Sequence, residues 1–227
     1  MECLYSPEFD KTMEAVPLDS DERRHLRALR LRPGDRVMVT NGRGLIAECR
    51  IEAGGADPVP LVFLPEYGES KNPPSLALGL LAARDRYEFA LEKAVEFGAA
   101  DFYPLITQFT QAKAIKPGRL QAKAIAAMKQ CKRSRLINIH KAMKLDELID
   151  EFQKYPTVAV ADPDGMDFAD IYIPGRILAV VGPEGGFSEA ELEMLRDSNA
   201  QFLRLGNRRL RAESAAIGAM ALISLQK

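Results

Sequence analysis

The chain has 227 residues, of which 47% are hydrophobic and 28% charged, as is ordinary for a soluble globular protein. Its formal net charge of −1 gives no overall sign of a nucleic-acid partner. The three scattered cysteines argue against a disulfide framework, no cysteine or histidine cluster has zinc-ligand spacing, and two histidines supply little for a histidine-based nucleophilic triad. The N-terminus lacks a signal-peptide core and no apolar run approaches the ~20 residues of a membrane span, so we expect a cytoplasmic protein without a metal.

The first 70 residues show the short, turn-punctuated pattern of a small β domain. A helix is predicted over 20–30, with Asp19 as its N-cap and Glu22 three residues later. The turn residues of Asn41–Gly44 predict a hairpin. Strands are predicted around 37–39, over 45–52 and over 59–64. This pattern favours a small barrel or sandwich.

The pattern of predicted elements changes after Lys71–Pro74, where paired prolines stop both helices and central strands. The predicted strands are 75–81, 102–106, 157–161, 177–181 and 202–205, and the predicted helices are 87–97, 119–131, 145–152, 188–196 and 213–226. Such alternation implies a parallel sheet with helices on both faces. We therefore predict two domains, residues 1–70 and residues 75–227, the second of the α/β class.

A glycine-rich loop, Gly182–Gly186, follows an apolar strand and precedes a helix whose start is marked by a capping box of Ser188 and Glu191. Its three glycines let backbone approach a ligand closely, and the carboxyl ends of parallel strands are where ligands bind in open α/β sheets. The spacing matches neither a dinucleotide fingerprint nor a P-loop. A purely structural strand–helix turn is the alternative.

An arginine-rich loop lies between the last strand and the last helix. Arg208, Arg209 and Arg211 fall within four positions and are followed by Glu213. Guanidinium groups suit phosphate or a base that develops negative charge, so we expect anion capture here. A solvated surface loop is the alternative.

The segment from Phe102 to Leu145 contains ten basic residues and no acid. Such a block predicts a local positive field suited to a phosphate backbone, unless acids from elsewhere compensate it in space. The arginine-rich helix near residue 25 is a second candidate RNA contact. The candidate RNA-binding residues are Arg23, Arg30, Lys113, Arg133 and Arg135.

Together, and in this order, these motifs resemble one family. GPEGGFS (Gly182–Ser188) followed by LGNRRLRAES (Leu205–Ser214) is similar to the paired signature loops of the RsmE family of 16S ribosomal RNA uridine N3-methyltransferases, in the SPOUT superfamily. Further similar segments are His25–Asp35, Leu91–Leu105, and Gln130 with Arg133.

The resemblance implies an α/β protein with a small N-terminal PUA-like β-barrel and a C-terminal SPOUT domain with a trefoil knot. It implies a homodimer that binds S-adenosylmethionine in the knot and acts on ribosomal RNA of the small subunit. The implied donor-binding residues are Ala161, Gly182, Pro183, Glu184, Gly185, Gly186, Leu205, Gly206, Asn207 and Leu210. Arg208 and Arg211 are expected to stabilise the uridine anion or its phosphate, and Glu184 and Glu213 to orient these arginines or accept the proton.

The chain departs from the family pattern at several positions. Arg209 replaces the usual Ile, Ala212 and Ser214 replace Thr, Ile137 replaces Pro, and Phe109 stands where an Arg is common. Because the donor is held largely by backbone, we expect these changes to affect RNA recognition more than donor binding. Two alternatives remain: a related knotted methyltransferase acting on a 2′-hydroxyl or a tRNA base, and a non-catalytic RNA-binding or ribosome-assembly protein that keeps the fold.

Overall fold

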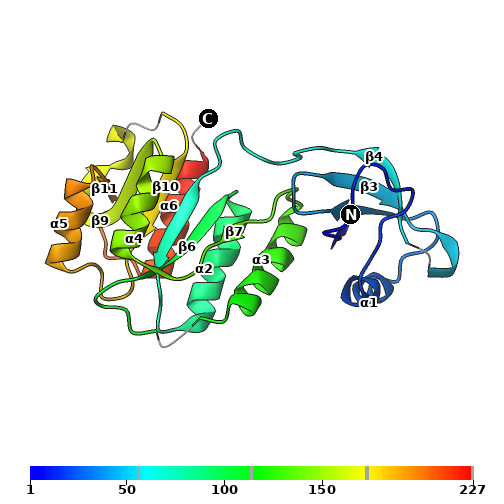
Figure 1. Ribbon diagram of the computed structural model, residues 1–227, viewed down its shortest axis with the longest axis horizontal. Helices are drawn as coiled ribbons and strands as arrows, with labels where there is room; N and C mark the ends of the chain where they lie inside the picture. The colour runs from blue at the N-terminus through cyan, green and yellow to red at the C-terminus, as the bar shows by residue number, and fades with distance from the viewer. Residues whose placement is uncertain (56, 113–114, 172–173, 226–227) are drawn as a thin grey trace. The chain divides into compact units, whose positions relative to one another are not determined.

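The computed structural model describes residues 1–55, 57–112, 115–171 and 174–225 (Figure 1). The chain divides into two compact units. The first comprises Met1–Ser70 and Ile125–Leu136, and the second comprises Lys71–Ala124 and Ile137–Lys227.

The first unit is built on a four-stranded sheet in the order β1-β2-β3-β4. Its strands are β1 (Cys3–Tyr5), β2 (Arg36–Thr40), β3 (Ile46–Arg50) and β4 (Val59–Phe63), with helix α1 (Ser20–Ala28) and a 3₁₀ turn at Ala53–Gly55. The β1–β2 pair is parallel and the other two pairs are antiparallel. The helix and three strands match the predictions. β1 was not predicted, because three residues are too few to show alternation.

The Asp19 side chain caps α1 as predicted, since its Oδ1 accepts hydrogen bonds from the backbone N of Asp21 and Glu22 at 2.9 and 2.8 Å. Leu26 packs on the core of this unit, whose buried members include Phe9 and Val39. The segment Ile125–Leu136 joins the same unit through the β2–β3 turn. The backbone N of Gly44 donates to Ser134 O at 2.8 Å, and the backbone N of Leu136 donates to Gly42 O at 2.9 Å.

The second unit is built on a seven-stranded sheet in the order β11-β9-β10-β5-β6-β7, with β8 beside β6. Its strands are β5 (Ser75–Gly79), β6 (Asp101–Ile106), β7 (Asn138–Ile139), β8 (Met143–Lys144), β9 (Thr157–Asp167), β10 (Ile177–Val181) and β11 (Gln201–Arg204). Its helices are α2 (Arg84–Glu96), α4 (Leu145–Glu151), α5 (Glu189–Asp197) and α6 (Ala212–Ser224). Two 3₁₀ turns lie at Phe152–Lys154 and Phe168–Asp170. Helix α3 (Pro117–Cys131) contributes residues to both units. All strand pairs recorded in this sheet are parallel, which confirms the prediction.

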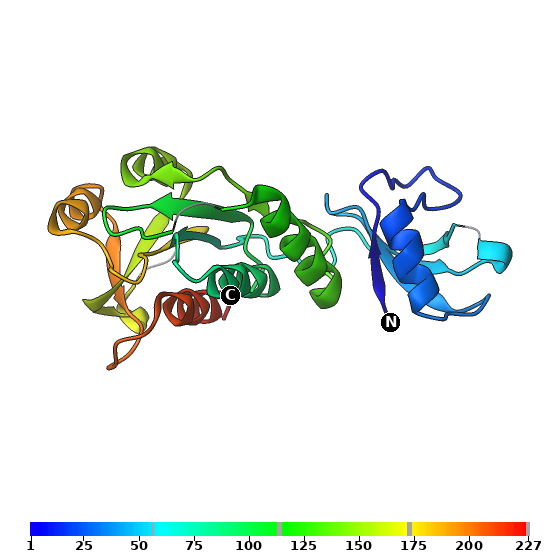
Figure 2. The same ribbon diagram turned by 90° about the horizontal axis from the view of Figure 1, so that it is seen from below.

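Helices cover both faces of this sheet. Figure 2 shows α4 and α5 on one face and α2 and α6 on the other. Every residue of β5 and β10 is buried as a result, which explains their continuous apolar sequences. None of the helices in the described part of the chain has both the length and the apolar composition needed to cross a membrane.

Candidate active site

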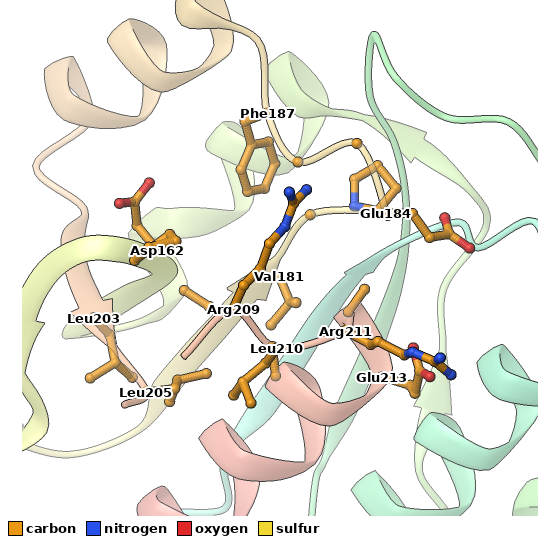
Figure 3. Close-up of a pocket in the computed structure, with 18 of the residues that line it drawn as sticks. Asp162, Val181, Glu184, Phe187, Leu203, Leu205, Arg209, Leu210, Arg211 and Glu213 are labelled. Carbon is orange, nitrogen blue, oxygen red and sulfur yellow. The ribbon is translucent and has the colours of Figure 1, made fainter. Parts of the chain in front are cut away.

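A pocket of about 600 Å³ lies beside the middle of β9, the ends of β10 and β11 and the start of α6 (Figure 3). Three segments form most of its wall: the middle of β9 at Ala161–Pro163, the glycine loop (residues 182–187) and the arginine loop (residues 205–211). Because parallel strands end at one edge of the sheet, segments far apart in sequence meet here. The volume is typical of a small-molecule or cofactor site.

The glycine loop adopts a tight turn that larger residues would disrupt. The backbone N of Gly186 donates to Pro183 O at 2.9 Å, and Gly186 has a φ of 72°. At Gly79, where β5 ends, an added Cβ would lie 2.3 Å from the Pro183 backbone N. At Gly185 an added Cβ would lie 2.7 Å from the Cβ of Phe109. The glycines therefore allow the loop to pack closely on the end of β5 and on the loop after β6.

Glu191 holds the end of the glycine loop in place. Its carboxylate accepts the backbone N of Ser188 at 2.8 Å and the backbone N of Gln108 at 2.8 Å. The Ser188 hydroxyl in turn accepts the backbone N of Glu191, which completes the predicted capping box at the start of α5. One carboxylate thus joins the loop after β6 to the start of α5.

The arginine loop supplies exposed positive charge beside an apolar wall. Arg208, Arg209 and Arg211 are exposed, and the described residues provide none of these three side chains with an ion pair or a hydrogen bond. Figure 3 shows Arg209 reaching across the pocket toward the glycine loop and Phe187. The apolar wall of the pocket includes Val181, Leu203, Leu205 and Leu210.

Two acids at the pocket have different surroundings. Glu184 is exposed, and its Oε1 accepts the backbone N of Ala82 at 3.0 Å. Glu213 is only 9% exposed, and its Oε1 lies 3.7 Å from Arg86 Nε. Its Oε2 is buried and has no hydrogen-bond partner among the described residues. A buried carboxylate oxygen without a hydrogen-bond partner lowers the stability of the fold unless a ligand donates a hydrogen bond to it.

All the expected donor-binding residues except Asn207 line this pocket, as do Arg208, Arg211 and Glu184. The pocket also contains Arg86 and Asp162, which the sequence analysis did not single out. Arg86 lies on α2, far from both loops in sequence, and only its position in the fold brings it to Glu213.

Acids from other elements pair with about half of the basic block, so the expected positive field is partly compensated. Five of the nine basic residues that the structure describes in this block form ion pairs, namely Arg119 with Glu88, Lys123 with Glu92, Lys129 with Glu22, Arg133 with Glu69 and Arg135 with Glu66. Each partner lies at least 31 residues away in sequence. The sequence window contained no acid because the partners come from other elements.

The candidate RNA-binding residues have unequal access to a ligand. Arg30 is exposed, and its side chain has no ion-pair or hydrogen-bond partner among the described residues. Arg23 and Arg135 pair with Asp57 and Glu66, yet their side chains remain 42% and 49% exposed. Arg133 is only 5% exposed and pairs with Glu69, so its charge supports the first unit. Lys113 lies outside the described residues.

The described residues contain no group of three or more His, Cys, Asp or Glu side chains arranged to hold a metal ion.

Comparison with known proteins decides the family. Residues 69–224 match the family described as RNA methyltransferase domain. The chain belongs to this family. Residues 18–64 match the RNA methyltransferase PUA domain, so the first unit of this family member contains a PUA-like domain.

Relatives of this RNA methyltransferase family member extend over nearly its whole length. It is 27% identical to ribosomal RNA small subunit methyltransferase E of Bacillus subtilis, over 87% of this chain and 84% of that protein. It is 28% identical to the protein of the same name from Mycobacterium bovis, over 98% of this chain and 90% of that protein. The crystal structure of ribosomal RNA small subunit methyltransferase E from Neisseria gonorrhoeae bound to S-adenosyl methionine is similar in fold, with a TM-score of 0.89 and 29% identity over 98% of this chain and 96% of that one.

Proposed function

We propose that this protein is an S-adenosylmethionine-dependent methyltransferase that methylates N3 of a uridine in the 16S ribosomal RNA of the small subunit. The observation that carries the proposal is the single pocket in which the glycine loop and the arginine loop meet. Its support is the match, along both units, to proteins named ribosomal RNA small subunit methyltransferase E.

The residues present fit such a donor. The pocket volume suits a ligand of this size, and its leucine-lined side can take an adenine ring. At Gly186 and Gly206 an added Cβ would meet no atom within 4 Å, so backbone borders open space there. The proposed donor-binding residues are Ala161, Gly182, Pro183, Glu184, Gly185, Gly186, Leu205, Gly206, Asn207 and Leu210.

The donor, when bound, supplies an electrophilic methyl group. The chain must remove the proton from uridine N3 and stabilise the resulting anion. Arg208 and Arg211 are proposed for the second task, because both are exposed at the pocket and have no acid partner among the described residues. Glu213, with a buried oxygen that lacks a partner there, is the better-placed proton acceptor, and Glu184 holds the loop after β5 through Ala82.

The proposal extends to binding and assembly. RNA is held by Arg23, Arg30, Lys113, Arg133 and Arg135, although Arg133 first has to leave Glu69. Residues 1–70 form a PUA-like barrel, the domain of residues 75–227 contains a trefoil knot, and the active enzyme is a cytoplasmic homodimer. The family resemblance supports these features.

The decisive experiment is nucleoside analysis of 16S ribosomal RNA from a strain that lacks the gene. We expect N3-methyluridine to disappear and to return when the wild-type gene is restored. Loss of a 2′-O-methyl group or of a tRNA modification instead would identify a different target. No change in RNA modification, together with no measurable donor binding in calorimetry, would favour a non-catalytic role in ribosome assembly.

A further inference from the structure

The pocket carries more arginines than acids, and arginines repel a cationic donor. Four arginines and three acids line it, and the only recorded ion pair among these seven residues joins Arg86 to Glu213. S-adenosylmethionine carries a sulfonium, an ammonium and a carboxylate, and is therefore a net cation. Its carboxylate is the only anionic group of the donor, and guanidinium–carboxylate contacts form charge-assisted, often bidentate hydrogen bonds.

Arg209 is the arginine placed to make that contact. Its side chain crosses the pocket and ends beside the glycine loop, whereas Arg211 points away on the side of Glu213 (Figure 3). Arg209 has no ion-pair or hydrogen-bond partner among the described residues, so binding a carboxylate breaks no existing contact.

The apolar part of the pocket indicates which end of the donor faces Arg209. Leu203, Leu205 and Leu210 lie on the opposite side of the pocket from the Arg209 guanidinium (Figure 3). An adenine ring gains most from burial against these leucines. The amino-acid tail, at the other end of the molecule, then extends toward Arg209.

We infer that Arg209 binds the carboxylate of the donor's amino-acid tail and thereby adds a specificity contact for donors that carry it. The inference rests on the proposed function, since it presumes an adenosyl donor in this pocket. It differs from the expectation that the Arg209 substitution affects mainly RNA recognition.

The test compares two ligands by calorimetry. S-adenosylhomocysteine has the amino-acid tail, and 5′-methylthioadenosine has the same adenosine and sulfur but lacks it. We expect Arg209→Ala to weaken S-adenosylhomocysteine binding about 10- to 100-fold and to change 5′-methylthioadenosine binding by less than about twofold. Arg209→Lys keeps the charge without the planar fork and should lose less than Arg209→Ala.

The control variant is Arg196→Ala, which removes an exposed arginine that does not line the pocket and should change neither affinity. Arg209 is exposed, so its variants should keep the wild-type melting temperature.

An equal loss of affinity for both ligands would place Arg209 at the adenosine. No loss of affinity for either ligand would assign Arg209 to RNA or solvent. Each of these results overturns the inference while the proposed function stands. A wild-type protein that binds neither ligand would overturn both.

Discussion

Asp101, at the start of β6, gathers polar partners at the amino end of the parallel sheet. Its Oδ1 accepts hydrogen bonds from His140 Nε2 at 2.9 Å and Asn138 Nδ2 at 3.1 Å, and its Oδ2 accepts one from Arg176 Nη2 at 3.0 Å. Burial raises the pKa of the Asp101 carboxyl, but the hydrogen bonds and the positive charges outweigh burial, so its pKa lies below the ordinary value. The ionised form therefore stabilises the fold.

The lowered pKa of Asp101 predicts how the stability of the fold depends on pH. A lowered pKa in the folded state gives stability that is present above the unfolded pKa, near pH ~4, and is lost as the pH falls through the folded pKa. We expect Asp101→Asn to reduce the free energy of unfolding by about 2 kcal/mol at neutral pH, and by less at pH ~3. Urea unfolding at both pH values measures this. Asp197→Asn, at an exposed position, is the control; an equal loss at both pH values would contradict the assignment.

Arg211 offers a way to separate turnover from donor binding. It is the N-cap residue of α6, but only its backbone O takes part in the helix, accepting Ala215 N at 2.8 Å. We expect Arg211→Ala to lower kcat about 100-fold while the Kd for S-adenosylhomocysteine stays within about twofold, because the side chain acts on the uridine anion. Steady-state kinetics and calorimetry test this. Unchanged turnover would remove Arg211 from the mechanism.

At the scale of elements, the end of β5 limits where the glycine loop can lie. A methyl group on Gly79 would collide with the Pro183 backbone, which is not a flexible side-chain end. We expect Gly79→Ala to cost about 1–3 kcal/mol of stability and to weaken donor binding, because the loop has to shift. Gly118→Ala on α3, where nothing lies within 4 Å, should be neutral or stabilising. Thermal unfolding and calorimetry compare the two variants, and similar effects would refute this packing argument.

At the scale of the whole molecule, apolar side chains remain exposed around the pocket. Leu210 and Phe109 are each 42% exposed, the first in the pocket wall and the second against Gly185. A second subunit that covers them would explain their exposure. We expect light scattering to give about 50 kDa, twice the 25.1 kDa of one chain. A mass of one chain at all concentrations used in activity assays would exclude the dimer.

The order of the elements and the two loops of the site can be predicted from the sequence, because their signals are local. Alternation and turn residues mark β2, β3 and β4, and the capping box of Ser188 and Glu191 marks the start of α5. The shortest strands, β1, β7 and β8, escape prediction, since two or three residues define no period.

Only the tertiary structure decided which charges remain available. From the sequence alone, Lys123 and Arg133 of the basic block are equal candidates to bind a phosphate. In the fold, Lys123 pairs with Glu92 and Arg133 pairs with Glu69, and both acids come from distant parts of the chain. Arg86 beside Glu213, and Arg209 reaching over the pocket, are likewise products of the fold. Electrostatic energy depends on distance in space rather than in sequence, so pairing between remote residues is settled only when the strands and helices pack.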